Sequence, residues 1–585
     1  MNPESRDCQN CRKEFTIEPE DFKFYEKMQV PPPTFCPQCR LIRKLTFRNQ
    51  RNLFIRKDDA SGKEIFSGIP QSAPLKVYDL DYWNSDNWDA MEFGRDYDFS
   101  RTFFEQFREL MHVVPFASKS VQFMVDSDYC DQASYMKDSY LCFDGGYLEN
   151  CAYCIRINNG KDSLDITEGV NPELCYDSFS INKCHKVFFS VDCENSFDIW
   201  FSRDLNGCNN CFGCVGLRNK SFYVFNKPCS KEEYFKKLTG FNLSSRKSLN
   251  EFREKSHEFW EKSPVKYMHG THNVDVMGDF IFNSKKTEKS YYVHEAENVK
   301  YSLYLFSDIK DSSDYVNWGY RASKMYECLT CGDQVNNLRF CWECWPSSRD
   351  IEYSMECRSS SDLFGCVGLK KKSYCILNKQ YTKEEYLALR EKIMKHMSKM
   401  PFIDKKGNTY KYGEFFPQEL SPFGYNHTTA IDFFPLSKEK ALEQGFVWQE
   451  PEAKEYKTTL DASLLPDTIG EVDDSVLKEI LKCTQCEKAY RIILKEIDFL
   501  RKMSLPLPTK CQNCRYVDRI KFRNQPKLYK RQCQCASEKS DNGIYSNEAK
   551  HKHGANHCPN QFETSYSPDR PDIVYCEDCY LQEVV

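Results

Sequence analysis

The sequence lacks several features that would assign it to a common class. It has no apolar run of about 18 residues, the length that a membrane-spanning helix needs. It opens MNPESRDCQN, without the apolar stretch of a secretory leader. We find no P-loop, no GxGxxG turn, no HExxH pair and no GxSxG elbow, and histidine is scarce, at 11 of 585 residues. These absences predict a soluble, cytoplasmic protein that does not contact a membrane and is not an enzyme of those classes.

Cysteine, by contrast, is abundant. The chain holds 31 cysteines, an odd number, and many occur as CxxC pairs. Disulfide scaffolds are usually short secreted chains with an even cysteine count, whereas CxxC knuckles suit one tetrahedral metal ion. We therefore expect reduced thiols and bound Zn²⁺, with an oxidised scaffold as the alternative.

The two ends of the chain repeat one module. When Cys8 is aligned with Cys483, CxxC-x24-CxxC at one end matches CxxC-x24-CxxC at the other without a gap, and CPQCRLIRKLTFRNQ matches CQNCRYVDRIKFRNQ. Four thiolates in two knuckles are typical of a zinc ribbon, which leaves no open position for catalysis. The predicted ligands are Cys8, Cys11, Cys36 and Cys39 at the N-terminus, and Cys483, Cys486, Cys511 and Cys514 at the C-terminus.

A further metal site is predicted at the C-terminus. The favoured ligands are Cys535, Cys558, Cys576 and Cys579, with Cys533 or His557 as substitutes. The equivalent N-terminal segment places Asp79 and Tyr82 where Cys576 and Cys579 stand, so we expect no metal there. About three Zn²⁺ ions per chain follow from these sites.

Basic residues follow the second knuckle of each module. Residues 36–57 carry five arginines, two lysines and no acid, and residues 510–531 carry eight basic residues and one acid. Arginines interleaved with aromatic residues suit phosphate contact and base stacking. We therefore expect nucleic-acid contacts, to RNA or DNA, from Arg40, Arg43, Arg48, Arg51, Arg515, Arg519 and Arg523. The alternative is that these cations pair with acids of this chain or of a protein partner.

The middle of the chain contains a second duplication. Residues 212–234 match residues 364–386, and both copies end in a capping-box helix start, at Ser230 and Thr382. Short β-like runs recur about every 10 to 13 residues, with inward Cys, Phe, Val and Ser alternating with outward polar residues. We favour a β-solenoid, with a barrel or a sandwich as alternatives.

The central cysteines allow two interpretations. Cys208, Cys211 and Cys214 form CxxCxxC, which we interpret as buried free thiols rather than an iron–sulfur site. A second central group has the spacing CxxC-x9-CxxC and is a candidate metal site, made of Cys328, Cys331, Cys341 and Cys344.

The predicted fold class is a multidomain, β-rich α+β protein, with zinc ribbons at both termini, a duplicated solenoid-like core and helical connectors. The predicted domains are an N-terminal ribbon (1–60), a degenerate second ribbon with a helix (61–120), β-repeat copy 1 (121–229), a helical connector (230–290), β-repeat copy 2 (291–381), a helix with an irregular connector (382–480), the C-terminal ribbon (481–532) and the second C-terminal zinc site (533–585).

The order of PPPTFCPQCRLIRK, DYDFSRTFFEQF, CFGCVGLRNKSFYVFNKPCSKEEY, YKYGEFFPQELSPFGYN and PDRPDIVYCEDCY covers nearly the whole chain. In these motifs the sequence resembles a zinc-ribbon, cysteine-rich repeat protein family of candidate phyla radiation (Patescibacteria) bacteria. The resemblance implies a bacterial cytoplasm and no particular activity. Relatives in that family usually keep CxxC knuckles where this chain has Asp79 and Tyr82.

Three functions remain open from the sequence. The first is a non-enzymatic zinc protein that binds nucleic acid through the basic segments, with a ribonucleoprotein as a possible setting. The second is a protein-interaction scaffold that uses the β-repeat surface. The third is a metal- or thiol-dependent enzyme that uses the central cysteines.

Overall fold

The structure, a computed structural model, describes residues 2–49, 51–450 and 456–584. The chain divides into two compact units. Unit 1 comprises Met1–Lys119, Met268–Glu450 and Gln525–Leu528, and unit 2 comprises Ser120–Tyr267, Pro451–Asn524 and Tyr529–Val585. Each unit thus joins one terminal cysteine module to one copy of the central repeat, the N-terminal module with the later copy. The predicted domain boundaries are finer than this division and stay predictions.

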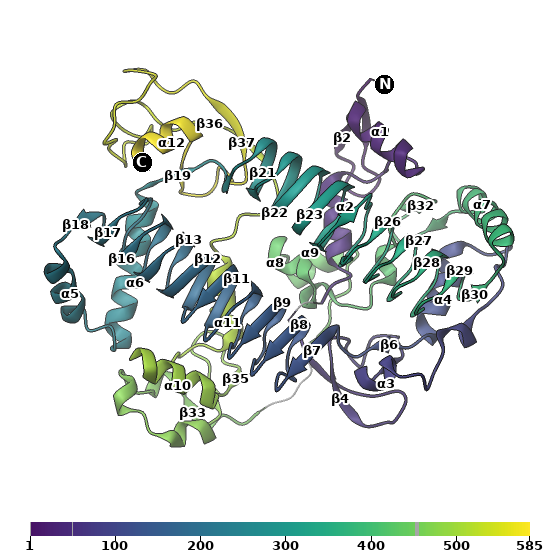
Figure 1. Cartoon of the computed structure of the whole chain (residues 1–585), viewed down its shortest axis with the longest axis horizontal. Helices are drawn as coiled ribbons and strands as arrows, with labels where there is room; N and C mark the ends of the chain where they lie inside the picture. Colours follow the sequence, from purple (N-terminus) through teal and green to yellow (C-terminus); the bar gives the residue numbers. More distant parts are fainter. Residues whose placement is uncertain (1, 50, 451–455, 585) are drawn as a thin grey trace. The chain divides into compact units, whose positions relative to one another are not determined.

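Unit 2 is built on a twelve-stranded sheet, visible in Figure 1 as the row from β7 to β18. Its strands run parallel, apart from the last pair, and residue i pairs with residue i+12, as Val121 does with Ala133. The strands are β7 (Val121–Val125), β8 (Asp131–Lys137), β9 (Phe143–Glu149), β10 (Ile155–Asn158), β11 (Leu164–Glu173), β12 (Tyr176–Phe188), β13 (Val191–Glu194), β14 (Phe197–Trp200), β15 (Arg203–Asn206), β16 (Asn209–Phe212), β17 (Ser221–Val224) and β18 (Lys227–Pro228).

Unit 1 contains a second sheet of the same kind, with eleven strands. Tyr291 pairs with Leu303 in the register of unit 2, whereas Leu303 pairs with Val316, which lies one residue further along. Its strands are β20 (Gly270–Thr271), β21 (Val274–Phe282), β22 (Lys285–Lys300), β23 (Leu303–Ser313), β24 (Val316–Gly319), β25 (Ala322–Ser323), β26 (Asn336–Arg339), β27 (Arg349–Glu352), β28 (Ser361–Phe364), β29 (Ser373–Ile376) and β30 (Lys379–Gln380).

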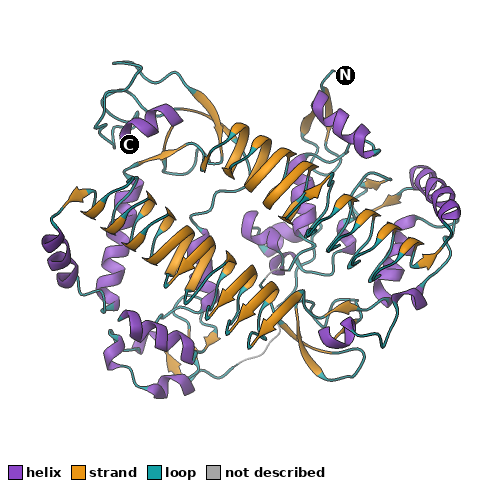
Figure 2. Cartoon of the chain, viewed as in Figure 1, coloured by secondary structure: helices purple, strands orange, loops and turns teal. Residues whose placement is uncertain are grey.

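This short register sets the architecture of both sheets. Parallel strands are usually joined by a crossover helix of a dozen residues or more, and a repeat this short leaves no room for one. Figure 2 accordingly shows rows of strands joined by loops. The β-rich α+β class is confirmed, with cysteine clusters near both termini. Neither sheet closes on itself within the described part of the chain, and the β-solenoid stays a prediction.

Backbone conformation in unit 2 follows a period of three residues. From Gln132 to Asp204 every third residue has a positive φ, between 45° and 63°. Asn and Asp tolerate this left-handed conformation better than most residues, and they occupy many of these positions. Other positions of the triplet point inward, where Cys142, Cys154 and Ser178 are buried. In β13 and β15 buried and half-buried residues alternate as predicted, although a left-handed residue recurs at every third position of the chain.

Both predicted capping boxes are confirmed. Ser230 caps α5 (Lys231–Gly240) together with Glu233, and Thr382 caps α7 (Lys383–Lys399) together with Glu385. The other α-helices are α1 (Pro19–Met28), α2 (Pro37–Leu45), α3 (Leu80–Asn84), α4 (Phe103–Val113), α6 (Arg246–Glu261), α8 (Thr429–Phe433), α9 (Lys438–Glu443), α10 (Leu494–Met503), α11 (Gln512–Ile520) and α12 (Glu577–Val584). Of the helices in the described residues, none has the length and apolar character to cross a membrane.

Short strands complete the terminal modules and connectors. The hairpin of the N-terminal module pairs β1 with β2, and in the C-terminal module β34 pairs with β35. These and the remaining short strands are β1 (Glu4–Asp7), β2 (Glu14–Ile17), β3 (Phe54–Lys57), β4 (Glu64–Ser67), β5 (Val77–Tyr78), β6 (Phe116–Ala117), β19 (Pro264–Lys266), β31 (Phe402–Ile403), β32 (Thr409–Tyr410), β33 (Leu460–Asp461), β34 (Leu481–Lys482), β35 (Ala489–Tyr490), β36 (Tyr529–Gln532), β37 (Gln561–Thr564) and β38 (Ile573–Tyr575).

Candidate metal centres and their cationic helices

The four cysteines of the N-terminal module converge on one point. Cys8 and Cys11 follow β1 in a tight turn, Cys36 is the N-cap of α2, and Cys39 lies in its first turn. Their four sulfur atoms lie within 4.8 Å of one another, and Cys11 Sγ is 3.8 Å from Cys36 Sγ. The backbone N–H of Cys36 donates to Cys8 Sγ over 3.2 Å, an interaction that stabilises a thiolate.

The C-terminal module repeats this geometry. Cys483, Cys486, Cys511 and Cys514 form the same kind of group, with 3.7 Å between Cys486 Sγ and Cys511 Sγ. The N–H of Cys511 donates to Cys483 Sγ over 3.2 Å. Burial opposes the charge of Cys483, but the N–H groups of Cys486 and Cys511 lower the pKa of its thiol to about 6.

These distances fit a tetrahedral metal ion. A Zn–S bond of about 2.3 Å implies about 3.8 Å between sulfur atoms, close to the observed separations and well beyond a disulfide bond of about 2.0 Å. All 31 cysteines of the chain are free thiols. Each terminal module therefore contains four thiols able to hold one metal ion, and the predicted residues of both groups lie together.

The second C-terminal group differs from its prediction in one member. The thiols of Cys558, Cys576 and Cys579 gather with Cys533, and all four are buried. Cys533 directly follows β36, and its sulfur accepts the N–H of Cys576 over 3.2 Å. Cys535, two residues further on, lies instead beside His553, whose Nε2 is 3.3 Å from Cys535 Sγ. Cys533, the predicted substitute, thus takes the place expected for Cys535.

His557, the other predicted substitute, lies outside this group. Its Nδ1 is 3.0 Å from the carbonyl oxygen of Cys558, and its Nε2 is 3.9 Å from Asp541.

The equivalent N-terminal segment has a carboxylate in place of Cys533, the sulfur that accepts the backbone N–H of Cys576. Asp58 corresponds to Cys533 when the two terminal modules are aligned, and its Oδ1 accepts the N–H of Asp79 over 3.0 Å. The N–H groups of Ala60 and Ser61 also donate to Asp58. Asp79 in turn caps α3. The hydrogen bond that the sulfur of Cys533 accepts at one end of the chain is therefore accepted by the carboxylate of Asp58 at the other, a substitution that the sequence comparison missed.

The central cysteines lie inside the sheets. Among the described residues, the thiols of Cys328, Cys331, Cys341 and Cys344 do not form a ligand group of the kind found at the termini. Each sulfur donates to backbone carbonyls instead, as Cys341 does to Ile351 over 3.3 Å. Cys208, Cys211 and Cys214 are also fully buried. Burial raises the pKa of the Cys193 and Cys366 thiols well above the ordinary value, which disfavours a reactive thiolate.

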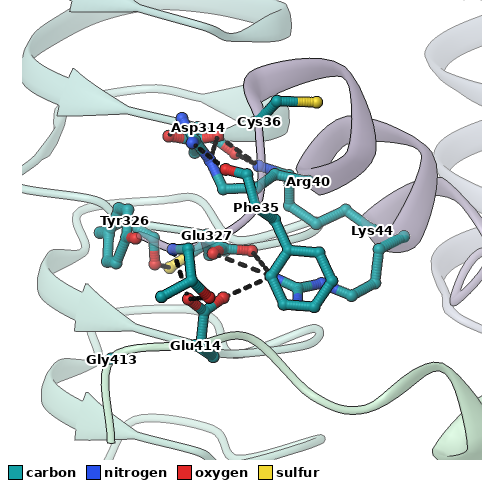
Figure 3. A network of polar contacts seen from close by, with 12 residues as sticks. Phe35, Cys36, Arg40, Lys44, Asp314, Tyr326, Glu327, Gly413 and Glu414 are labelled. Carbon is teal, nitrogen blue, oxygen red and sulfur yellow. Dashed lines mark hydrogen bonds and ion pairs between the residues drawn. The ribbon is translucent and has the colours of Figure 1, made fainter. Parts of the chain in front are cut away.

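The basic residues of α2 are buried against the sheet of unit 1. Figure 3 shows Arg40 and Lys44 beside Asp314, and Glu327 beside Glu414. Arg40 donates to both oxygens of Asp314 over 2.8 and 2.9 Å, and Lys44 Nζ lies 3.1 Å from the same carboxylate. Although burial opposes its charge, Arg40 and Lys44 hold the pKa of Asp314 below its usual range.

The other N-terminal arginines are also engaged within unit 1. Arg43 pairs with Glu327 over 2.9 Å and with Glu414 over 3.3 Å. Arg48 is buried and donates to Thr330, and Arg51 lies 3.5 Å from Asp432 with 19% of its side chain exposed.

Helix α11 of the C-terminal module makes matching contacts in unit 2. Arg515 pairs with Asp165 over 2.9 Å, and Arg519 pairs with the same carboxylate over 2.9 Å. Arg523 lies 2.6 Å from Glu168. Arg515 and Arg519 correspond to Arg40 and Lys44 in the alignment of the two modules, so in each unit two cations one helical turn apart hold one buried aspartate. Local sequence contains no signal for these carboxylates, which lie hundreds of residues from their partners.

Together these features define a β-rich protein in which thiol groups able to hold a metal lie next to cationic helices buried on parallel sheets. A scan against family models found no match for the chain, and a search of curated proteins found no similar one. The nucleic-acid contacts expected from the seven arginines stay a prediction, and six of the seven side chains are buried.

Proposed function

We propose that this protein is a non-enzymatic, zinc-stabilised scaffold that binds a polypeptide partner. In this proposal each terminal ribbon holds one structural Zn²⁺ ion, and the ion fixes the start of a cationic helix that docks on a repeat sheet. The observation that carries the proposal is the burial of Arg40 and Lys44 on Asp314, repeated by Arg515 and Arg519 on Asp165. Cations paired with buried aspartates hold the helix on the sheet. In that position they do not contact a phosphate group.

The cost of exposing these cations favours the scaffold over a nucleic-acid grip. Withdrawing the cation from a buried ion pair leaves its carboxylate buried without compensation, at a cost of about 3–5 kcal/mol. A phosphate contact by Arg40 or Arg515 would have to offset that cost. Nucleic-acid binding would then depend on other cations of the chain.

An exposed aromatic column offers a surface for the partner. Phe123, Tyr135 and Tyr147 lie on adjacent strands β7, β8 and β9 and are 63%, 44% and 58% exposed. The rings stack at centroid distances of 4.5 Å, and the planes of Tyr135 and Tyr147 differ by only 3°. Because the facing sides of neighbouring rings cover one another, a nucleobase cannot insert between them. Exposed ring edges and tyrosine hydroxyls are typical of protein interfaces.

Titration with nucleic acid tests the choice of ligand. Zinc-loaded full-length protein is titrated with labelled single-stranded RNA and with duplex DNA at several salt concentrations. We expect no binding with the slope of about −0.7 to −0.9 per neutralised phosphate that backbone contacts produce. Affinity that falls steeply with salt would overturn the scaffold proposal and restore the arginine segments as candidate contacts.

Site-specific crosslinking tests the proposed surface. A photoreactive amino acid is placed at Tyr135, and at Lys183 as a control, because Lys183 is an exposed residue further along the same sheet, on β12. We expect a nuclease-resistant protein adduct from position 135 that is lost when Phe123 and Tyr147 are changed to serine. A nuclease-sensitive adduct, or equal adducts at both positions, would contradict the proposal.

A further inference from the structure

Two groups of metal-ligating atoms meet at one cysteine of the C-terminal region. The first group is Cys533, Cys558, Cys576 and Cys579. The second is Cys535, His551, His553 and Cys579, whose ligand atoms also lie within 4.8 Å of one another. We propose that this region holds two metal ions bridged by the Cys579 thiolate, one bound by four sulfurs and the other by two sulfurs and two imidazoles. This goes beyond the structural zinc of the ribbons.

The histidines are oriented as metal ligands. Nε2 of His551 lies 2.8 Å from Oε1 of Glu583, while Nδ1 of His551 is buried without a hydrogen-bond partner. Nδ1 of His553 lies 2.7 Å from the carbonyl oxygen of Asn556, which leaves Nε2 facing Cys535 at 3.3 Å. Each ring thus gives its N–H to an oxygen and keeps a lone pair on its other nitrogen, the arrangement that metal-bound histidines usually show.

Surrounding side chains hold this second group in place. Asn547 Nδ2 donates to Cys535 Sγ over 3.3 Å, and its Oδ1 accepts from the hydroxyl of Tyr575 over 2.8 Å. Glu583 also accepts from Tyr545 and from the N–H of Glu548, each over 2.9 Å. Cys579 and Glu583 are four residues apart on α12 and therefore share one helix face. A carboxylate so heavily hydrogen-bonded fixes the imidazole of His551 beside the shared sulfur.

Charge balance favours the second ion. A divalent ion with four thiolates carries two excess negative charges, and all four of these cysteines are buried. A second divalent ion adds only one further thiolate, Cys535, because neutral imidazoles supply its other ligands. The pair then carries one excess negative charge, which is less costly to bury than two. A single ion would also leave Nδ1 of His551 buried and unpaired.

Metal counting on the full-length protein is the first test. With one ion in each ribbon and two at the C-terminus, we expect four Zn²⁺ per chain after purification and exhaustive buffer exchange. The double variant His551→Ala, His553→Ala should hold three. The control His557→Ala, in the same segment but outside both groups, should hold four. Three ions in the wild type, or four in the double variant, would overturn the proposal.

Cadmium-113 NMR of the wild-type chain tests the bridge without any variant. Two cadmium resonances at the C-terminal region should be split by coupling to each other through the Cys579 sulfur, and one should show the shift expected for mixed sulfur and nitrogen ligation. Uncoupled resonances, or sulfur-only ligation for every ion, would overturn the shared thiolate.

Discussion

Arg40 and Asp314 form a two-pronged ion pair in which both side chains are only 1% exposed, although 274 residues separate them in the sequence. The pair joins α2, which carries Cys39 of the N-terminal four-cysteine group, to the sheet of unit 1. Lys44 reaches the same carboxylate from the next helical turn. In the sequence this basic segment suggests contacts to phosphate groups. In the structure its Arg40 and Lys44 form buried ion pairs within unit 1.

Removing the shared carboxylate should destabilise unit 1 strongly. Asp314→Ala leaves Arg40 and Lys44 buried without a counter-charge, and we expect a loss of about 3–5 kcal/mol in the free energy of unfolding. The control is Asp311→Ala, because Asp311 pairs with Lys27 where both side chains are partly exposed. That change should cost no more than about 1 kcal/mol. The free energy of unfolding is measured by chemical denaturation. Equal decreases for the two variants would show that the buried ion pair stabilises the fold no more than the exposed one.

Zinc removal should loosen both cationic helices. In the proposed ribbons the metal ligands Cys36 and Cys39 lie at the start of α2, and Cys511 and Cys514 lie at the start of α11. Chelation should therefore increase hydrogen exchange in residues 37–45 and 512–520 before it does so in strands β9 and β10, which have no zinc ligands. Hydrogen-exchange mass spectrometry with and without chelator measures this order. Unchanged exchange in the two helices after complete metal loss would contradict the structural role.

Protonation of His294 should weaken the fold as pH falls. Its ring stacks between Phe282 and Phe306 at centroid distances of 4.8 and 5.4 Å, and burial lowers its pKa to about 4. The unfolded chain binds this proton near pH 6.5, so the stabilising effect is complete above that pH and is lost as pH falls toward 4.

The variant His294→Phe isolates this effect. It should keep the stack and remove on the order of 1 kcal/mol of acid sensitivity between pH 7 and pH 5. Denaturation curves of the two proteins at matched pH values cancel contributions from other groups. A constant difference in unfolding free energy across this range would show that His294 does not titrate as expected.

Thiol labelling should separate the sheet cysteines from accessible ones. Cys229 is partly exposed and lies 3.1 Å from Nζ of Lys237, whereas Cys193 and Cys366 are buried, with raised pKa values. Brief alkylation of the native zinc-loaded protein should modify Cys229 first, as read by peptide mass spectrometry. Rapid modification of Cys366 would instead revive the thiol-enzyme alternative.

The sequence alone determined the parts that depend on short spacings. Two CxxC knuckles at one fixed spacing define a four-thiol group, and the pairs Ser230–Glu233 and Thr382–Glu385 define helix starts. Such features form from a few residues that are close in the sequence, so their spacing is enough to predict them. The regular recurrence of short strands likewise anticipated the observed register.

Only the tertiary structure decided what the cations contact and which thiols gather. Whether Arg515 faces a phosphate or Asp165 depends on a carboxylate that is distant in the sequence and is brought near by folding. Cys533 and Cys535 are equivalent in a linear reading, and the pairing of β36 with β37 places the first beside Cys576 and leaves the second beside His553. The three-residue period of the backbone could not be predicted from the sequence either. It depends on a left-handed conformation that Asn and Asp adopt more readily than other residues but do not require. Contacts between residues distant in the sequence thus decided which side chains meet. Composition and spacing could only suggest candidate residues.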